Sequence, residues 1–264
     1  AQLEKGVFAG DDSIVYRSFF TAGPHPRECL VVFPEAMTNN DFVSEFVLMP
    51  LSEESLDPKL KGKDLAQFLV ERVLPVNAVQ QKDNLSEAVN FILTGDAALF
   101  VDGCATALII PSKSITFRLP SEPSAEAVVR GPREGFCEAL SINLTLLRRR
   151  IRTPMLKFIY LEVGRQTKTK VAIAYIEGIA APAIVEEVRK RVAGIDIDSV
   201  LDSGYIEELI EDAPLSPFKT IGHTERPDIV AGRILEGRVA VMVDGSPAAL
   251  TMPYLLVESL QANE

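Results

Sequence analysis

The sequence has no tryptophan, two histidines and only three cysteines among 264 residues. Cys29, Cys104 and Cys137 lie far apart and form no C-x-x-C pair, which argues against a structural zinc site and against a disulfide framework. A sparse, odd set of cysteines in apolar runs is typical of buried thiols in a reducing compartment. His25 and His223 stand in no metal-ligand spacing, so we expect surface histidines and no metal or other cofactor.

Long apolar runs and catalytic motifs are also missing. No stretch reaches the about 18 apolar residues that a membrane-spanning helix needs, and no signal peptide is apparent, so we expect this chain to be soluble by itself. G-x-S-x-G, P-loop and G-x-G-x-x-G motifs are absent, and none of the 37 acidic residues is singled out as a catalytic partner. We therefore expect that the chain is not an enzyme.

The composition that is present fits a globular protein with a sizeable core. Hydrophobic residues make up 47% of the chain and charged residues 24%. The formal net charge is −10, which repels nucleic acid and anionic lipid. We expect no nucleic-acid partner, and a role at a membrane surface is disfavoured.

The most informative feature is an internal repeat. Leu93–Pro111 and Leu235–Pro253 both follow L-x-G-x-x-A-x-x-V-D-G-x-x-x-A-L-x-x-P, with nine of nineteen positions identical and an offset of 235 − 93 = 142. The same offset extends upstream without a gap. We therefore predict that residues 14–111 and 156–253 are two copies of one supersecondary plan.

The second copy gives the clearest pattern. Alternating and continuous β-branched runs predict strands at 156–163 and 171–176, and apolar residues at helical spacing predict helices at 184–192 and 200–211. The first helix has two i,i+4 ion pairs, Glu186 with Lys190 and Glu187 with Arg191. The second helix has as its apolar positions Leu201, Ile206, Leu209 and Ile210.

Each copy ends in a predicted hairpin. Asp102-Gly103 and Asp244-Gly245 stand between apolar runs, and D-G is the strongest short-range hairpin signal. A pair of ligand-binding carboxylates is the alternative, and turn chemistry is favoured. Strands that alternate with helices predict an α/β fold with mixed sheets, in two similar subdomains (1–120 and 155–264) joined by a helical linker (121–154).

The linker breaks the repeat. Apolar residues from Phe136 to Ile151 predict a helix of about five turns that ends at Thr153-Pro154. Its end carries more cations than the helix dipole requires, namely Arg148, Arg149, Arg150 and Arg152. One interpretation is a solvated basic helix end; another is a contact with carboxylates of the other subdomain or a neighbouring subunit, such as Glu207, Glu208, Glu211 and Asp212. An anion or a lipid headgroup is a less favoured target.

Further interface candidates flank this helix. Arg130, Arg133 and Glu134 lie in an R-G-P-R-E-G segment, whose glycines and proline predict a bent path, and we expect them to pin the linker between the subdomains. Arg226 and Asp228 surround a helix-starting proline, and a structural Arg–Asp contact is favoured over a ligand role.

Glu35 and Glu177 occupy equivalent positions in the two copies. Each follows a predicted buried strand and precedes a helix, the place where open α/β sheets bind ligands. A carboxylate there suits the amino group of a small molecule. Local capping or pairing is the favoured alternative.

Several longer phrases resemble the A subunit of GerA-type spore germinant receptors. The resemblance is dense over 128–253 and thinner over the first copy, and it departs from the family at Cys137, where a hydroxyl residue is expected. The phrases are VVRGPREGF (128–136), NLTLLRRRI (143–151), YIEGIA (175–180), SPF (216–218) and RPDIVAGRILEGRVAVMVDGSPAALTMP (226–253).

The resemblance implies a hydrophilic N-terminal domain, on the cytoplasmic side, of a subunit that continues into transmembrane helices in the inner membrane of the spore. It implies B and C subunits as partners, nutrient sensing that triggers ion release, and a ring of A subunits that forms an ion channel. It supplies no catalytic residues.

Two functions from different classes follow. An interaction and signalling module, built around the basic helix end, is favoured. A binding module for a nutrient amino acid or sugar, with a cleft between two lobes and Glu35 and Glu177 as ligand contacts, is the alternative.

Overall fold

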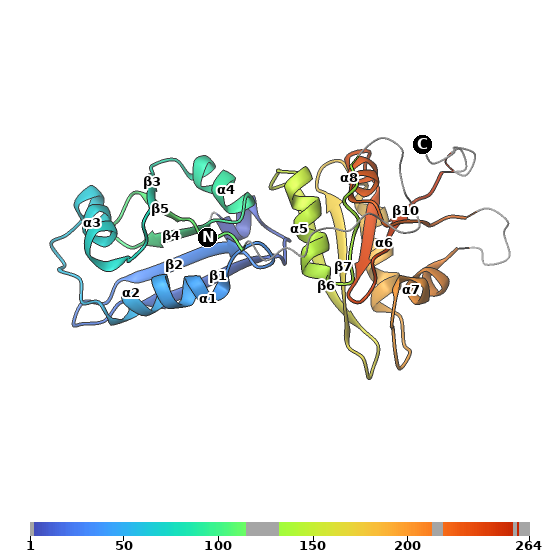
Figure 1. Cartoon of the computed structure of the whole chain (residues 1–264), viewed down its shortest axis with the longest axis horizontal. Helices are drawn as coiled ribbons and strands as arrows, with labels where there is room; N and C mark the ends of the chain where they lie inside the picture. The colour runs from blue at the N-terminus through green and yellow to red at the C-terminus, as the bar shows by residue number, and fades with distance from the viewer. Residues whose placement is uncertain (1–2, 115–131, 213–218, 256–257, 259–264) are drawn as a thin grey trace. The chain divides into compact units, whose positions relative to one another are not determined.

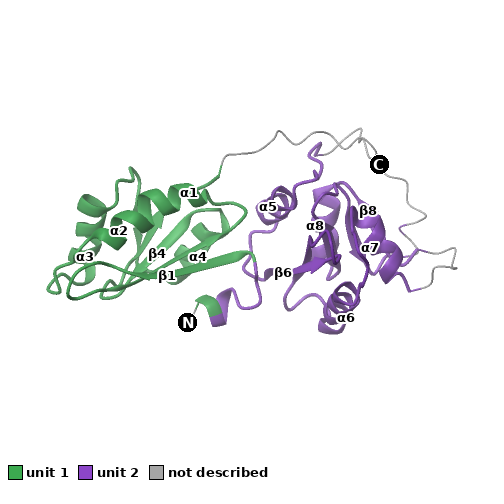
Figure 2. Cartoon of the chain, turned by 90° about the horizontal axis from the view of Figure 1, so that it is seen from below, with its two compact units in different colours: residues 1–4, 13–116 green, residues 5–12, 117–264 purple. Residues whose placement is uncertain are grey.

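The computed structural model describes residues 3–114, 132–212, 219–255 and 258 (Figure 1). The chain divides into two compact units (Figure 2). Unit 1 comprises Ala1–Glu4 and Ser13–Thr116, and unit 2 comprises Lys5–Asp12 and Phe117–Glu264. Unit 2 therefore includes a short segment from the beginning of the chain, and the boundary predicted at residue 120 lies outside the described residues.

Unit 1 is built on a five-stranded sheet with the order β1-β2-β4-β5-β3, in which all neighbouring strands are antiparallel. Its strands are β1 (Ile14–Phe20), β2 (Glu28–Pro34), β3 (Gln80–Lys82), β4 (Ala97–Val101) and β5 (Ala107–Ile110). Its helices are α1 (Asn40–Val43), α2 (Met49–Glu53), α3 (Gly62–Phe68) and α4 (Leu85–Leu93), with the π-helical segments η2 (Ser44–Leu48) and η3 (Leu69–Val73); η1 (Leu3–Val7) spans the boundary between the units.

Unit 2 repeats this arrangement with the order β6-β7-β9-β10-β8, again antiparallel throughout. Its strands are β6 (Leu156–Val163), β7 (Thr169–Ile176), β8 (Gly222–Thr224), β9 (Val239–Val243) and β10 (Ala249–Met252). Its helices are α5 (Leu140–Arg150), α6 (Pro182–Ala193), α7 (Ser203–Ile210) and α8 (Pro227–Leu235).

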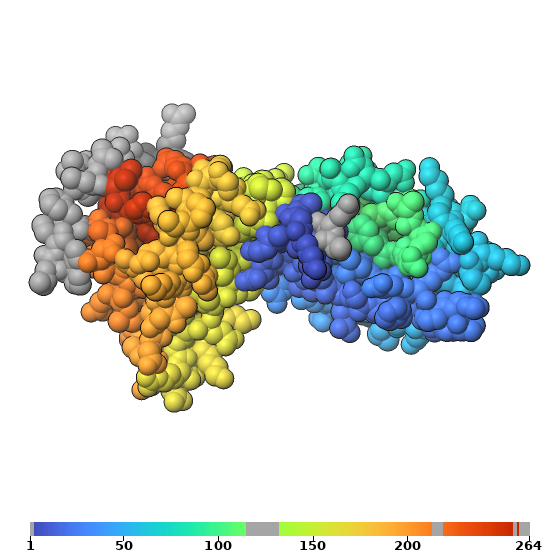
Figure 3. Space-filling view, turned by 180° about the vertical axis from the view of Figure 1, so that it is seen from behind, coloured from blue at the N-terminus to red at the C-terminus, as the bar shows by residue number. Residues whose placement is uncertain are grey.

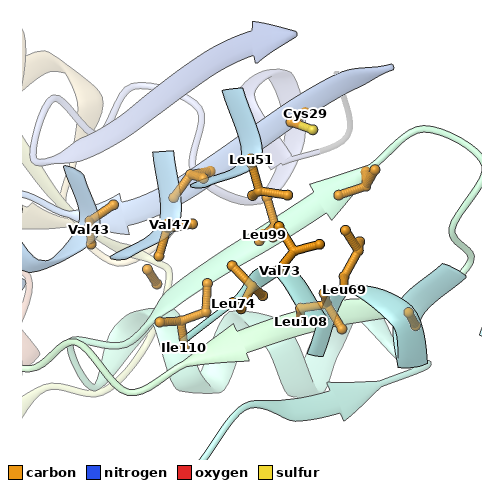
Figure 4. Packing of buried hydrophobic residues seen from close by; sticks show 14 of the residues in the cluster. Cys29, Val43, Val47, Leu51, Leu69, Val73, Leu74, Leu99, Leu108 and Ile110 are labelled. Atoms are coloured by element: carbon orange, nitrogen blue, oxygen red, sulfur yellow. The ribbon is translucent and has the colours of Figure 1, made fainter. Parts of the chain in front are cut away.

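The core of unit 1 lies between one face of its sheet and the helices from α1 to η3. Figure 4 shows Leu99 of β4 beside Leu51 of α2, and Leu108 of β5 beside Leu69 of η3. All of these side chains are at most 1% exposed, so their burial is the main stabilising term of this layer. The helix α4 contributes further buried residues, Ala88, Val89, Ile92 and Leu93.

The sheet of unit 2 is covered on both faces. One apolar cluster joins α5 and α8 to Phe158, Ala172 and Ala240 of the strands. The other joins α6 and α7 to Ile173 and Val241, which alternate with the first set along the strands. The helix α5, predicted as part of a linker, therefore packs in the core of unit 2, and it is shorter than the predicted five turns.

The predicted duplication is confirmed by the elements and by their register. The strand β4 maps onto β9 (239 − 97 = 142), and α4 maps onto α8 (227 − 85 = 142). The pairing Cys29↔Val101 corresponds to Val171↔Val243 at the same offset. The α/β class with two similar subdomains is thus confirmed, and within each sheet the strands pair antiparallel.

Local predictions in unit 2 have mixed outcomes. Glu187 pairs with Arg191 at 2.7 Å as predicted, whereas Glu186 pairs with Arg189 at i,i+3 instead of with Lys190. Leu201 and Leu209, predicted as apolar positions of a helix, are exposed by 61% and 50%.

The three cysteines are all free, as predicted. Only Cys29 is fully buried, whereas Cys104 and Cys137 are half-buried.

Candidate functional site: the strap and the outer face of α7

The N-terminal segment of unit 2, Lys5–Asp12, lies against the edge strand β6, and we call it the strap. The backbone N–H of Asp12 donates to the oxygen of Phe158 (2.9 Å), and the N–H of Tyr160 donates to Oδ2 of Asp12 (2.9 Å). The strap therefore covers part of an edge that would otherwise offer unpaired backbone groups.

A buried ion pair fixes the strap to α5. Nη2 of Arg148 donates to Oδ2 of Asp11 at 2.7 Å, and the two side chains are 2% and 0% exposed. The guanidinium also lies 4.8 Å from the ring centroid of Phe158. Arg148, predicted at an interface with the other subdomain or a neighbouring subunit, is thus enclosed within unit 2. Its partner is 137 residues away in the sequence, so no local pattern indicates the pair.

A second buried cation lies under the strap. Nζ of Lys157 donates to the backbone oxygen of Val7 at 3.0 Å, and its side chain is 0% exposed. Glu177 lies 3.6 Å away and is 55% exposed. Burial raises the pKa of the nearby Tyr175 phenol, and the charges of Glu177, Asp11 and Asp12 raise it further.

The rest of the predicted arginine cluster pairs locally. Glu134 accepts from Nη2 of Arg150 at 2.6 Å and lies 3.9 Å from Arg149. Of the acidic groups predicted to meet this cluster, Asp212 pairs with Arg191 at 2.6 Å and Glu207 lies 3.8 Å from His223. Among the described residues these pairs differ from the predicted contact of the basic helix end with the acidic residues at 207–212, and a contact with a neighbouring subunit stays a prediction.

The other interface candidates are a paired arginine, an exposed arginine and a residue outside the described part. Arg226 pairs with Asp228 at 2.6 Å and is 8% exposed, as expected for a structural helix start. Arg133 is exposed, and Arg130 lies outside the described residues.

The two D-G pairs form tight turns. Gly103 and Gly245 have φ of +82° and +90°, which glycine adopts without steric cost. In unit 2 the turn also caps a helix, because Oδ1 of Asp244 accepts from the N–H of Leu140 at the start of α5 (3.1 Å).

Glu35 and Glu177 are both exposed at the ends of β2 and β7. Their backbones agree, since Glu35 N–H donates to Ser13 and Glu177 N–H donates to Met155. Their side chains differ, because the position of Lys157 in unit 2 is Val15 in unit 1 (157 − 142 = 15). A ligand role for them stays a prediction.

Three large apolar side chains are exposed on α7 and immediately before it. Leu201, Tyr205 and Leu209 are exposed by 61%, 41% and 50%, whereas Ile206 and Ile210 are buried. We call Leu201, Tyr205 and Leu209, together with the acidic residues Asp202, Glu208 and Glu211, the α7 face. Figure 3 shows the yellow-orange and orange residues of α6 and α7 at the surface of unit 2. Tyr205 and Leu209 stand at i,i+4 on α7 outside the buried set, and this spacing is the sequence signal of a second apolar face; Leu201 precedes the extended N-cap Asp202.

A pocket of about 410 Å³ lies beside this region, between α6 and the end of β10. Its wall is apolar, with Ile184, Val188 and Ile221, and its three charged residues are paired with each other: Glu187, Arg191 and Asp212. Within the described ranges no group of acidic, histidine and cysteine side chains is arranged to hold a metal ion. None of the helices described has the length and apolar character to cross a bilayer.

Comparisons with known proteins identify the relatives. A family model described as Bacillus/Clostridium GerA spore germination protein matches residues 2–264. Spore germination protein KA of Bacillus subtilis (strain 168) is 36% identical over 264 residues, 100% of this chain and 48% of the relative. Spore germination protein GerLA of Bacillus cereus is 36% identical over 253 residues, 96% of this chain and 51% of the relative.

A solved structure has the same fold. The crystal structure of the N-terminal domain of the A subunit of the Bacillus megaterium spore germinant receptor GerK3 matches with a TM-score of 0.68 and 34% identity, over 95% of this chain and 92% of that chain. The chain spans about half the length of the curated relatives it matches. It therefore belongs to the GerA spore germination family and has the fold of the N-terminal domain of a germinant receptor A subunit.

Proposed function

We propose that this domain is an interaction module that holds a germinant receptor together and passes on the nutrient signal. In the whole protein it lies on the cytoplasmic side of the inner spore membrane and contacts B-type and C-type subunits. The observation that carries the proposal is the α7 face, whose three large apolar side chains are 41% to 61% exposed. Exposed apolar patches on a folded domain mark contact surfaces, and these three side chains lie within nine residues of one another in the sequence.

The proposal is tested with a full-length A subunit in which the α7 face is made polar by Leu201→Gln, Tyr205→Gln and Leu209→Gln. We expect less B-type and C-type subunit to co-purify with the A subunit from spore membranes, and slower germination with nutrient. A matched control changes the equivalent positions on α3 and before it, which are already polar: Lys59→Ala, Lys63→Ala and Gln67→Ala. Normal subunit recovery and normal germination with the α7 variant would contradict the proposal.

Nutrient binding is a second candidate, supported by the exposure of both Glu35 and Glu177 at equivalent strand ends. An amide NMR titration with amino acids and sugars at millimolar concentration tests it. Saturable shifts around either glutamate, absent in Glu35→Gln and Glu177→Gln, support binding here. Unchanged spectra across the panel exclude it for this domain.

A further inference from the structure

The duplication provides an internal comparison for the α7 face. Residues 201, 205 and 209 correspond to Lys59, Lys63 and Gln67 of unit 1 (201 − 142 = 59). These three side chains are also exposed. The helices α3 and α7 are at matching positions in two sheets of identical order and register. The fold therefore accepts polar residues here, and apolar ones in unit 2 are not required by the architecture.

The charge around the two helices differs as well. Residues 201–212 contain five acidic residues, of which Asp212 pairs with Arg191 of α6, and no lysine or arginine, whereas 59–70 contain three lysines and one aspartate. Glu208 is exposed between Tyr205 and Leu209, and Asp202 caps the helix through Gly204 N–H. Carboxylates therefore stand beside the exposed apolar side chains, on α7 and at its N-cap.

We propose that the α7 face binds a helix of another polypeptide that carries apolar residues at i,i+4 spacing beside lysine or arginine. Apolar anchors at this spacing fit a helix-to-helix contact. The carboxylates select a basic partner, because like charges across an interface are costly. This inference rests on the proposed interaction function and specifies the chemistry of the partner.

A second copy of this chain is a poorer occupant. A two-fold contact between α7 faces would bring acidic residues of both copies together. The net charge of −10 adds a general repulsion between copies. An anionic membrane is repelled by the same carboxylates.

The inference is tested with the 264-residue chain and two synthetic amphipathic helices of about 18 residues, or five turns, one built from leucine and lysine and one from leucine and glutamate. Calorimetry gives the Kd, and amide NMR shifts give the location. We expect the leucine–lysine helix to bind at the α7 face. The α7 variant (L201Q, Y205Q, L209Q) should bind it at least about tenfold more weakly, because anchor residues supply most of the binding energy.

Matched variants separate the two chemical requirements. Glu208→Gln with Glu211→Gln should weaken binding of the leucine–lysine helix and lower its salt dependence, while the α3 variant (K59A, K63A, Q67A) should bind as the wild type does. Amide spectra of each variant check that the fold is intact. The inference is overturned if the leucine–glutamate helix binds equally well, if the α7 variant keeps wild-type affinity, or if sedimentation shows a self-associated chain that the α7 variant dissociates.

The two proposals fail in different ways. If the α7 variant disrupts receptor recovery in spores but the leucine–lysine helix has no preference for the face, the interaction function stands and the basic partner is wrong. If the peptide prefers the face but spores with the α7 variant recover all subunits and germinate normally, the interaction function is wrong for this surface.

Discussion

Asp11 and Arg148 show how much of the stability of unit 2 depends on single side chains from distant segments. Both charges are removed from water, and each compensates for the other at 2.7 Å. Removing one member of such a pair costs more than removing both, because the remaining charge stays buried without its partner.

We expect Asp11→Ala to destabilise unit 2 by about 3–5 kcal/mol, the usual cost of leaving a buried charge without its partner. Arg189→Ala, which breaks an exposed pair on α6, should cause little change. Hydrogen exchange of β6 and β7 amides measures the effect within unit 2. Asp11→Leu combined with Arg148→Met should recover most of the loss; a double variant as unstable as Asp11→Ala would contradict this account.

Cys29 provides a second test at the residue scale. Its side chain is 0% exposed, and burial raises the pKa of its thiol to about 12; the charge of Arg27 lowers the pKa and that of Glu28 raises it. Because the thiolate is the reactive form, we expect iodoacetamide at pH 8 to modify Cys104 and Cys137 well before Cys29, and all three in urea.

The raised pKa also sets a pH dependence. Above about pH 9 the thiol ionises in the unfolded chain but stays protonated in the native one, so the free energy of unfolding falls as the pH rises toward 12. Cys29→Ala should remove this contribution to the pH dependence.

In the labelling experiment, modification of native Cys29 by iodoacetamide at the rate of Cys104 would show that the burial of Cys29 is transient.

At the scale of elements, the two D-G turns both have a positive φ at glycine but different neighbouring residues. A Cβ on Gly103 would lie 2.5 Å from Nη1 of Arg27, whereas a Cβ on Gly245 would meet nothing closer than the oxygen of Leu201 at 3.5 Å. Arg27 donates to the backbone oxygens of Asp57, Leu60 and Asp102, so it is not easily displaced.

We expect Gly245→Ala to cost about 1–2 kcal/mol from its positive φ alone. Gly103→Ala should cost more, because Arg27 must also leave at least one of its carbonyl partners. Hydrogen exchange of β4 and β5 amides against β9 and β10 amides compares the units in one experiment. Equal losses in the two units would show that Arg27 rearranges freely.

The sequence predicts elements well where the pattern is local or repeated. The D-G hairpins, the strand at 156–163 and the offset of 142 follow from periodicity and internal identity, and all are confirmed. The apolar pattern of 200–211 predicts the helix but not its orientation, because both sides carry apolar residues. The helix at 136–151 is overestimated, because the carboxylate of Asp244 fixes its start near Leu140.

Features that join distant segments were not predictable. The strap reaches β6 from the beginning of the chain, and its contacts involve Asp11, Asp12 and Val7, none of which belongs to a motif. The arginine cluster is evident in the sequence, but its division into different roles is not. Arg148 is buried against Asp11, whereas Arg149 and Arg150 lie near Glu134, and this difference depends on the three-dimensional packing of α5.

At the scale of the whole molecule, two copies of one plan have acquired different surfaces. Both units keep the same strand order and register, while the equivalent helices α3 and α7 carry lysines in one unit and apolar and acidic residues in the other. A duplicated scaffold of this kind maintains the fold with one set of positions and leaves the exposed positions open to a new role. At the α7 face, unit 2 exposes leucine and tyrosine where unit 1 exposes lysine and glutamine.

The most direct test places a photo-crosslinking amino acid at position 205 of the full-length A subunit in spores, and at the equivalent position 63 as the control. We predict that irradiation links position 205 to a B-type or C-type subunit, at a peptide with apolar and basic residues in helical spacing, and that position 63 gives no such product. An absence of crosslinks to another subunit at position 205, or equal crosslinking at both positions, would contradict the assignment of the α7 face as the contact surface.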